Sequence, residues 1–334
     1  DELRSEPLAL LVGPSGSGKS SLLRAGIIPA LRSEGSLPVV VTPSADPIGS
    51  LAAALESISS AATGSIRSDL DAGAPLPVIV DRIAPGSQVV IAVDQMEELF
   101  TLATAEDAEA LLAAIASAVT ASDGRLRVIG CLRADFFVHP LASPSFGALA
   151  GPGTVTIGPM RAEQLAAAIT EPARLSGVTV EEALVSELAA ETAGRAGSLP
   201  LMQFALTRAW DERSGSTVTL GDYEKLGGLT GTLVRSAEAT WEGLSESDQA
   251  AARRLLPRLV QIGEEVTRRR EEVGAALSLT GVEPNLIEAF VSARLVTVDR
   301  DRATREPTIE LSHEALIEAW PRLARWVEDS GAAL

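Results

Sequence analysis

The sequence is poor in the residues that stabilise secreted proteins or form membrane spans. Its single cysteine, Cys131, excludes an internal disulfide and is typical of a reducing compartment, so we expect a cytoplasmic protein. Aromatic residues make up only 3% of the chain, so its cores must consist mainly of Ala, Leu, Val and Ile. The longest uncharged apolar stretch, Ala110–Ala121, is shorter than the ~20 residues of a membrane-spanning helix. We therefore expect no membrane span.

Positive charge is also scarce. The 28 Lys and Arg residues are outnumbered by 45 Asp and Glu residues, which gives a formal net charge of −17. Binding to nucleic acid requires local positive charge, so we do not expect nucleic acid as a partner, although the run Arg268-Arg269-Arg270 could form a local patch. A length of 334 residues predicts two or three domains. Because the first residue is Asp1 and not Met, we expect a module of a longer polypeptide.

The most informative motif lies near the start of the chain. Residues 13–20 spell GPSGSGKS, a complete phosphate-binding loop (Walker A motif), directly after the apolar run Leu8–Val12. A strand, a glycine-rich turn and a helix in this order let backbone N–H groups and the helix N-terminus surround phosphate oxygens. Lys19 can reach the β- and γ-phosphates, and the Ser20 hydroxyl can ligate Mg²⁺. The predicted nucleotide-binding residues of this loop are Gly13, Pro14, Ser15, Gly16, Ser17, Gly18, Lys19, Ser20 and Ser21.

A second motif supplies a carboxylate for the metal. The strongly apolar run Val89–Val93 ends at Asp94, as in a Walker B motif. Ligands gather at the carboxyl ends of parallel strands, and an aspartate there can orient Mg²⁺ or a water bound to it. An apolar strand that ends in aspartate is common, but beside a complete Walker A motif it indicates a nucleotide site. We therefore predict Ser20 and Asp94 as the metal-binding residues.

Hydrolysis needs a group that orients or deprotonates the attacking water. Many P-loop ATPases carry a glutamate directly after the Walker B aspartate, but this chain has Gln95 there. Glu97 and Glu98 follow, and we expect Glu97 to act on the water, unless both are acids that stabilise a helix N-terminus. Arg133 ends the next predicted strand and can neutralise γ-phosphate charge, unless it pairs with Asp135 instead. Lys19, Asp94, Glu97 and Arg133 are thus the predicted catalytic residues.

Strand and helix signals alternate through the first half of the chain. This order is typical of a parallel sheet covered by helices on both faces, so we predict an α/β fold with a three-layer αβα core. The expected strands are Leu8–Val12, Val39–Val41, Val89–Val93, Leu126–Leu132 and Thr154–Ile157.

Polar residues mark the starts of several helices. Asp46 can cap a helix that runs toward Ser59, and Thr104 can cap an alanine-rich helix. Ser245 with Asp248 forms a capping-box pattern before a helix expected to run toward Ile262, with Pro257 as a possible kink.

The second half of the chain has a different pattern. Helical periodicity dominates from Arg161 to about Gly243, and no convincing strand is found there. Near the end, a helix over Pro284–Ala293 precedes two β-like runs, Leu295–Val298 and Thr308–Leu311, with a charged turn over residues 299–306 between them. Helices followed by a β-hairpin predict a winged-helix module.

Several strings together match one family in order. In them the chain resembles the STAND class of signal-transducing P-loop NTPases, specifically the bacterial novel STAND NTPase group. The resemblance covers nearly the whole chain. Its strings are GPSGSGKSSLLRAGIIPAL (13–31), VVVTPSADP (39–47), AVDQMEELFT (92–101), LRADFF (132–137), SLPLMQFAL (198–206), YEKLGG (223–228) and LSHEALIEAWPRL (311–323).

The resemblance implies three parts: a P-loop NTPase core over residues 1–158, a helical lid over 159–243 and a winged-helix domain over 244–334. It also implies that Pro200 of the lid contacts adenine and that His313 of the winged helix bonds the β-phosphate of ADP. Pro200 could instead only start the helix that follows it, and His313 could be a structural histidine. Family members carry an adenine-binding segment upstream of the first strand, and we expect that segment to be missing here.

The implied function is a switch driven by ATP and ADP with Mg²⁺. ADP would hold the parts closed, and exchange for ATP would open them and allow self-association, with slow hydrolysis as the reset. The partners would be the nucleotide and other domains of the parent chain, namely sensor repeats and an effector. The absence of a guanine-reading Asn-Lys-x-Asp motif favours ATP over GTP.

Two alternatives remain open from the sequence. One is an ATP-dependent DNA-binding initiator or transcription regulator whose winged helix contacts DNA. The candidate recognition helix Asn285–Arg294 has Arg294 as its single basic residue, which disfavours DNA. The other is a nucleotide-binding scaffold that does not hydrolyse ATP, which Gln95 leaves open.

Overall fold

The computed structural model describes residues 6–59, 65–121, 124–195, 197–213, 215–262, 266–281, 283–300 and 306–331. The chain folds into two compact units, and the division falls after Gly158. None of the helices in these ranges is both long and apolar enough to cross a membrane.

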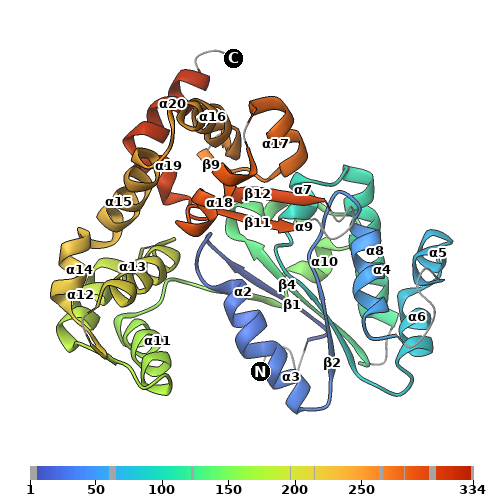
Figure 1. The fold of residues 1–334 in the computed structure, drawn as a ribbon. Coiled ribbons are helices and arrows are strands. Elements are labelled where there is room, and N and C mark those ends of the chain that lie inside the picture. The colour runs from blue at the N-terminus through green and yellow to red at the C-terminus, as the bar shows by residue number, and fades with distance from the viewer. Residues whose placement is uncertain are drawn as a thin grey trace. The chain divides into compact units, whose positions relative to one another are not determined.

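The first unit is built on a parallel sheet of five strands in the order β2-β3-β4-β1-β5 (Figure 1). Each strand lies where an apolar run of the sequence predicts one, so the predicted α/β fold with a parallel sheet is confirmed. In this order β4 lies between β1 and β3, the strands that carry the two predicted nucleotide motifs. The strands are β1 (Leu8–Gly13), β2 (Leu37–Val41), β3 (Val89–Val93), β4 (Leu126–Arg133) and β5 (Thr154–Thr156).

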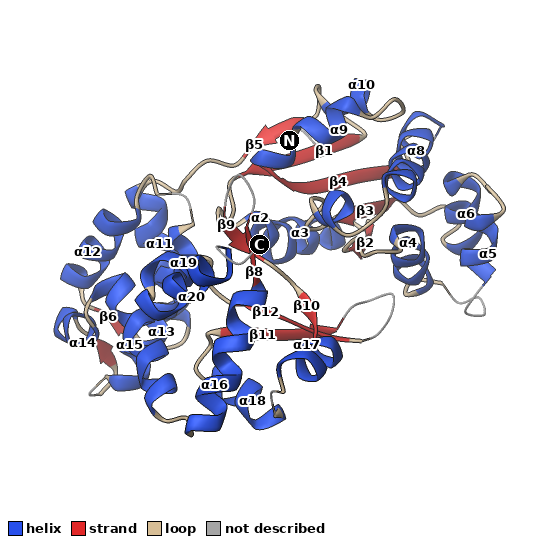
Figure 2. Ribbon diagram, turned by 90° about the horizontal axis from the view of Figure 1, so that it is seen from above, coloured by secondary structure: helices blue, strands red, loops and turns tan. Residues whose placement is uncertain are grey.

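Helices connect these strands and are drawn in blue around the red strands in Figure 2. The chain leaves β1 through the phosphate loop and enters a helix whose middle is a wide π-helical segment, η1. The helical segments of the first unit are α2 (Lys19–Ser21), η1 (Leu22–Ile27), α3 (Ile28–Ser33), α4 (Pro47–Glu56), α5 (Ser65–Asp71), α6 (Leu76–Ile83), α7 (Glu98–Thr101), α8 (Ala105–Ala121), the 3₁₀ turn η2 (Ala134–Phe136), α9 (Val138–Ala142) and α10 (Gly147–Ala150).

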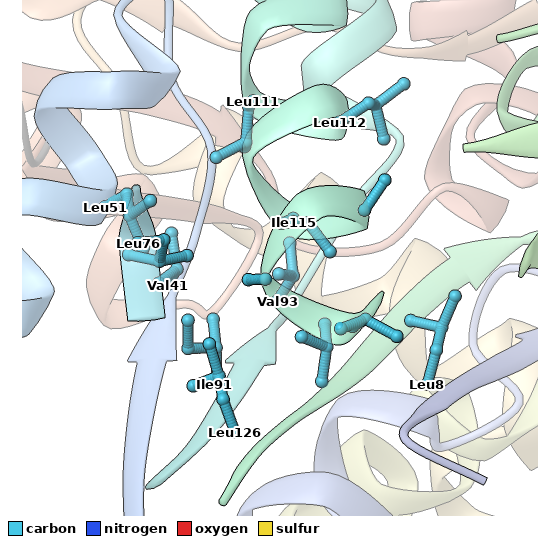
Figure 3. Packing of buried hydrophobic residues seen from close by; sticks show 14 of the residues in the cluster. Leu8, Val41, Leu51, Leu76, Ile91, Val93, Leu111, Leu112, Ile115 and Leu126 are labelled. Carbon is cyan, nitrogen blue, oxygen red and sulfur yellow. The ribbon is translucent and has the colours of Figure 1, made fainter. Parts of the chain in front are cut away.

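Both faces of the sheet are covered, because its strands are apolar throughout and their side chains alternate between the faces. On one face Leu8 of β1 and Ile91 of β3 belong to a cluster with Leu111 of α8 (Figure 3). On the other face Leu11 of β1 packs in a smaller cluster with Leu23 of η1. The helix that follows the phosphate loop is thereby fixed against the sheet.

Three predicted helix caps are confirmed. The Asp46 carboxylate accepts a hydrogen bond from the backbone N–H of Gly49 at 2.9 Å. The hydroxyls of Thr104 and Ser245 each accept one from the residue three positions on, both at 3.2 Å. Each bond satisfies a donor that the first turn of a helix leaves without an intrahelical partner.

The first part of the second unit is largely helical, with a short parallel pair of strands that the sequence did not predict. Each strand has two residues, too few for an alternating pattern to be visible in the sequence. Leu165, Leu188 and Tyr223 belong to the hydrophobic cluster of this part. Its elements are α11 (Ala162–Leu175), β6 (Thr179–Val180), α12 (Glu182–Thr192), α13 (Ser198–Glu212), β7 (Thr217–Val218), α14 (Leu220–Leu226) and α15 (Gly228–Glu242).

The remainder of the second unit combines helices with an antiparallel sheet in the order β10-β12-β11. Both predicted β-like runs near the chain end are strands, with Val298 of β11 opposite Ile309 of β12. The turn expected between them lies outside the described residues at positions 301–305. The elements are α16 (Glu246–Leu255), the 3₁₀ turn η3 (Leu256–Leu259), β8 (Val260–Ile262), β9 (Val266–Arg268), β10 (Glu271–Glu272), α17 (Val273–Thr280), α18 (Pro284–Ser292), β11 (Val296–Arg300), β12 (Pro307–Leu311), α19 (Ala315–Ala319) and α20 (Pro321–Gly331).

The helix predicted from Ser245 toward Ile262 is wrong beyond Leu255. Pro257 has no backbone N–H to donate and lies in the 3₁₀ turn η3. The chain then extends into β8, which pairs with β9 in an antiparallel hairpin.

We predict that Leu111→Ala lowers the free energy of unfolding by about 2–5 kcal/mol, because it leaves a cavity between α8 and the sheet. Leu111 is 1% exposed, whereas Leu102, the matched control, is 40% exposed. Leu102→Ala should cost less than about 1 kcal/mol. Urea unfolding followed by circular dichroism measures both, and equal losses would contradict the assigned core.

Candidate nucleotide site

The loop after β1 has a backbone that requires glycine at three positions. A Cβ on Gly13 would lie 2.4 Å from the carbonyl oxygen of Ile157, so no side chain fits there. Gly16 and Gly18 have φ values of 69° and 88°, in the left-handed region that glycine adopts without strain. The loop is further held by a hydrogen bond from the Ser17 backbone N–H to the Pro14 carbonyl at 3.3 Å. The glycines of the motif are therefore explained by the loop geometry itself.

A buried polar atom in this loop fits an anionic ligand. The Ser17 hydroxyl is buried, and it has no hydrogen-bond partner among the described residues. Buried hydroxyls are almost always hydrogen bonded, and a phosphate oxygen is an acceptor that such a group can serve. The loop residues present thus fit a phosphate group.

Lys19 is held inside the loop. Its ammonium donates hydrogen bonds to the carbonyl oxygens of Gly13 and Pro14, each at 2.8 Å. Burial lowers the pKa of Lys19, and the nearby Glu97 carboxylate opposes this shift. The backbone of the loop therefore holds a cation at a position where it can meet phosphate charge.

Asp94 is the centre of a hydrogen-bond network at the end of β3. The Ser20 hydroxyl donates to Asp94 Oδ1 at 2.7 Å, and the Gln95 backbone N–H donates to the same atom at 3.1 Å. Arg24 Nε donates to Asp94 Oδ2 at 2.7 Å. The structure thus brings the two predicted metal-binding residues into direct contact and adds an arginine beside them.

A hydroxyl and a carboxylate are oxygen donors of the kind that Mg²⁺ prefers, so Ser20 and Asp94 fit this ion. The described part of the chain contains no group of three or more His, Cys, Asp or Glu residues that could hold a metal. A magnesium ion at Ser20 and Asp94 would therefore need phosphate oxygens and water as its other ligands, as is usual for Mg²⁺ with nucleotides.

Arg24 was missed in the sequence. It lies one helical turn after Ser20, so both side chains project from the same side of the helix toward the end of β3. That spacing is visible in the sequence and could have identified Arg24 once Ser20 and Asp94 were paired.

Glu97 lies close to the loop, at the start of the short helix α7. Its carboxylate accepts a hydrogen bond from the backbone N–H of Arg133 at 3.3 Å. Burial raises the pKa of Glu97, while hydrogen bonds and the charges of Lys19 and Arg133 act in the opposite direction. Lys19, Asp94, Glu97 and Arg133 therefore gather at one edge of the sheet, and the catalytic roles of these residues remain predictions.

Arg133 forms the ion pair with Asp135 that the sequence left open as the alternative to a phosphate contact. Its guanidinium bonds both carboxylate oxygens of Asp135, at 3.1 Å and 2.7 Å, and lies 5.6 Å from the centre of the Phe136 ring.

Gln95, at the usual position of a catalytic glutamate, has a left-handed φ of 54°. A non-glycine residue in this region carries strain, which is common next to functional sites.

Pro200 and His313 belong to the second unit and are both associated with α13. Pro200 lies in the first turn of this helix, where a missing N–H is tolerated. The His313 ring packs edge-on against Phe204 of α13, with ring centres 5.0 Å apart. Burial, reinforced by the charge of Arg268, lowers the pKa of His313 to about 4, so its imidazole is neutral at pH 7. Its Nδ1 is buried without a partner in the described residues.

Together the fold and this site define a P-loop NTPase. The sequence matches the family model described as novel STAND NTPase 1 over residues 1–334, and the chain belongs to this family. No curated protein matches the sequence.

Several solved structures are similar to this chain at low sequence identity. The ORC2 protein of Aeropyrum pernix, in ADPNP–ADP complexes, is 16% identical with a TM-score of 0.50 over 98% of this chain and 89% of that chain. The ORC1 protein of the same organism, in complex with DNA, is 17% identical with a TM-score of 0.47 over 98% and 88%. The RuvB Holliday junction branch migration motor of Thermotoga maritima is 17% identical with a TM-score of 0.43 over 95% and 89%. At 16% identity the likeness to the ORC2 protein concerns the fold alone.

We predict that Glu97→Gln stabilises the protein at neutral pH. A carboxyl whose pKa is raised by folding favours the folded state at low pH, and this contribution is lost as pH rises from the unfolded value of 4.5 through the folded value. The glutamine variant should therefore be more stable than the wild type at pH 7 and equal to it below pH 4.5.

Urea unfolding over a pH series measures this difference. Glu106→Gln, in the first turn of α8, is the control and should instead lose about 0.3–1 kcal/mol at neutral pH, because it removes a favourable charge from a helix N-terminus. A Glu97→Gln variant that is less stable at pH 7 would contradict the raised pKa of this carboxyl.

Proposed function

We propose that this chain is the nucleotide-dependent switch module of a larger signalling protein, which binds ATP with Mg²⁺, hydrolyses it slowly and retains ADP. The observation that carries the proposal is the phosphate loop around Lys19 beside the Ser20–Asp94 pair. Family membership supports an NTPase, and the absence of a guanine-reading motif favours ATP.

Nucleotide binding would use groups that are already in place. The loop N–H groups, the N-terminus of the helix that begins at Lys19 and the Ser17 hydroxyl would receive the phosphates. Lys19 would exchange a carbonyl of the loop for a phosphate oxygen, a stronger acceptor because it is charged. Ser15 and Ser21 have small side chains, which fits the contact between phosphates and backbone N–H groups that we assign to residues 13–21.

Hydrolysis would use Glu97, whose charge acts on Lys19. Mg²⁺ bound through Ser20 and Asp94 would supply charge neutralisation on the phosphates. Glu97, whose pKa is raised by burial, is the candidate that accepts a proton from the attacking water. Arg133 would have to leave Asp135 before it could reach a γ-phosphate. This requirement, with Gln95 in place of the usual glutamate, supports slow turnover.

The second unit would act as the sensor of the nucleotide state. We assign residues 159–243 as a helical lid and 244–334 as a winged-helix domain, with Pro200 contacting adenine and His313 contacting the β-phosphate of ADP. The support is that both residues are associated with α13 and that Nδ1 of His313 has no partner in the described residues. In the ATP state, release of these contacts would let copies of the parent chain self-associate and bring its effectors together.

DNA binding is not proposed, because two members of the basic run near β9 make contacts within the second unit. Arg268 donates to the carbonyl oxygens of Leu311 and Ser312 at 3.0 Å and 3.2 Å. Arg270 forms an ion pair with Glu310 at 3.4 Å. A surface that binds phosphates would need such charges to be available.

We predict that Lys19→Ala lowers the affinity for ATP and ADP at least about a hundredfold, because it removes a charge-assisted contact to phosphate. Lys225→Ala is the matched control, since the Lys225 side chain is 77% exposed on the second unit. Isothermal titration calorimetry measures both affinities, and circular dichroism checks the fold. Wild-type affinity in the Lys19 variant would overturn the assignment of the phosphate loop.

We also predict that ADP retention strengthens as pH falls. A hydrogen bond to the backbone of Arg294 favours the protonated ring of His313, and Nδ1 is buried without a partner among the described residues. A protonated ring carries a donor on both nitrogens, so Nδ1 can then donate to a phosphate. The phosphate would raise the low pKa of His313, so ADP binding takes up a proton, with an affinity change of at most about tenfold per pH unit.

The dissociation rate of a fluorescent ADP analogue between pH 6 and pH 8 tests this linkage. We expect the dissociation rate to fall with falling pH in the wild type and in His139→Gln. In His313→Gln the rate should depend less on pH. His139 stacks on Phe100 in the first unit, with ring centres 4.9 Å apart. Identical profiles for the wild type and the His313 variant would refute the phosphate contact.

A further inference from the structure

The ion pair between Arg24 and Asp94 has no part in the function proposed above. Its atoms are 2.7 Å apart, and it joins a side chain that is 48% exposed to one that is only 2% exposed. The other oxygen of Asp94 is already bonded to Ser20 and to the Gln95 N–H. Both carboxylate oxygens of Asp94 are therefore hydrogen bonded to groups of the protein itself.

A buried carboxylate needs a compensating charge, and Arg24 supplies it. In P-loop NTPases the Walker B aspartate and the serine of the loop hold Mg²⁺. Arg24 and Mg²⁺ would thus compete for the charge of one carboxylate, and two cations beside it repel each other. Because Arg24 is half exposed, water can reach the carboxylate if the guanidinium leaves it.

The helix that carries Arg24 has an unusual geometry at this residue. Arg24 lies within the π-helical segment η1, which begins directly after the turn that carries Ser20. π-Helical segments are rare, and they are frequent at functional sites. Here Ser20 and Arg24 both donate to Asp94.

We propose that Arg24 is a positioning residue that acts as the resident counter-ion of Asp94 and weakens the binding of Mg²⁺ at the nucleotide site. The inference rests on the proposed function, because it concerns the metal that accompanies the nucleotide. Mg²⁺ then binds firmly only when phosphate oxygens add enough ligands to displace or outweigh the guanidinium.

The experiment measures the Mg²⁺ concentration at which the affinity for a fluorescent ADP analogue is half-way between its values in EDTA and in saturating Mg²⁺. Arg24→Gln removes the charge but keeps hydrogen-bond donors, and we expect its Mg²⁺ midpoint to fall about tenfold. Arg24→Lys keeps the charge and should stay within about threefold of the wild type. Arg32→Gln, at an exposed position of α3, removes the same charge away from Asp94 and should leave the midpoint unchanged.

Each outcome decides a different claim. A fall in the Mg²⁺ midpoint for Arg24→Gln, without one for Arg32→Gln, supports the role of Arg24. If Arg24→Gln binds the nucleotide with an unchanged or higher midpoint, the ion pair is only structural and this inference is wrong, while the proposed function stands. If the wild type binds no ADP or ATP analogue at any Mg²⁺ concentration, the proposed function fails, and the inference fails with it. If Arg24→Gln does not fold, the Mg²⁺ midpoint is measured for Arg24→Ala, where it must fall below that of the wild type. The midpoint of Arg24→Lys must match that of the wild type.

Discussion

The site depends on one buried carboxylate directly after strand β3, a strand inside the five-stranded sheet. Asp94 is 1% exposed, and an unpaired charge at such a position would cost several kcal/mol. The hydroxyl of Ser20 and the guanidinium of Arg24 satisfy it from the helix that follows the phosphate loop. The same contacts therefore neutralise the carboxylate and fix the loop and its helix against the sheet.

The loop itself is organised by a second charge. Lys19 is bonded to two carbonyl groups of its own loop, so the cation and the backbone hold each other in position. Strand β4 lies between β1, which leads into the loop of Lys19, and β3, which leads into Asp94. Arg133 ends β4, and its backbone N–H donates to Glu97. Positive and negative groups thus lie together at one edge of the sheet. This arrangement suits a ligand that combines phosphates with a divalent cation.

The sequence predicted the elements whose signals are local. The strand β3, the caps at Asp46 and Thr104 and the phosphate loop follow from neighbouring residues, and the structure has them at the predicted positions. The contact of Arg24 with Asp94 joins residues 70 positions apart. The spacing of one helical turn between Ser20 and Arg24 is visible in the sequence, but it indicates this contact only once Ser20 is paired with Asp94. The pair β6–β7 was missed because two-residue strands carry no periodicity. Beyond Leu255 the helical pattern was overridden by Pro257 and by pairing of β8 with β9.

The central claim is that this chain holds a nucleotide at the phosphate loop and retains ADP. The most direct measurement denatures the purified protein and identifies any released nucleotide by chromatography. The account predicts ADP in a ratio close to one per chain. A protein that releases no nucleotide, and that also binds neither ADP nor ATP when they are added, would contradict it.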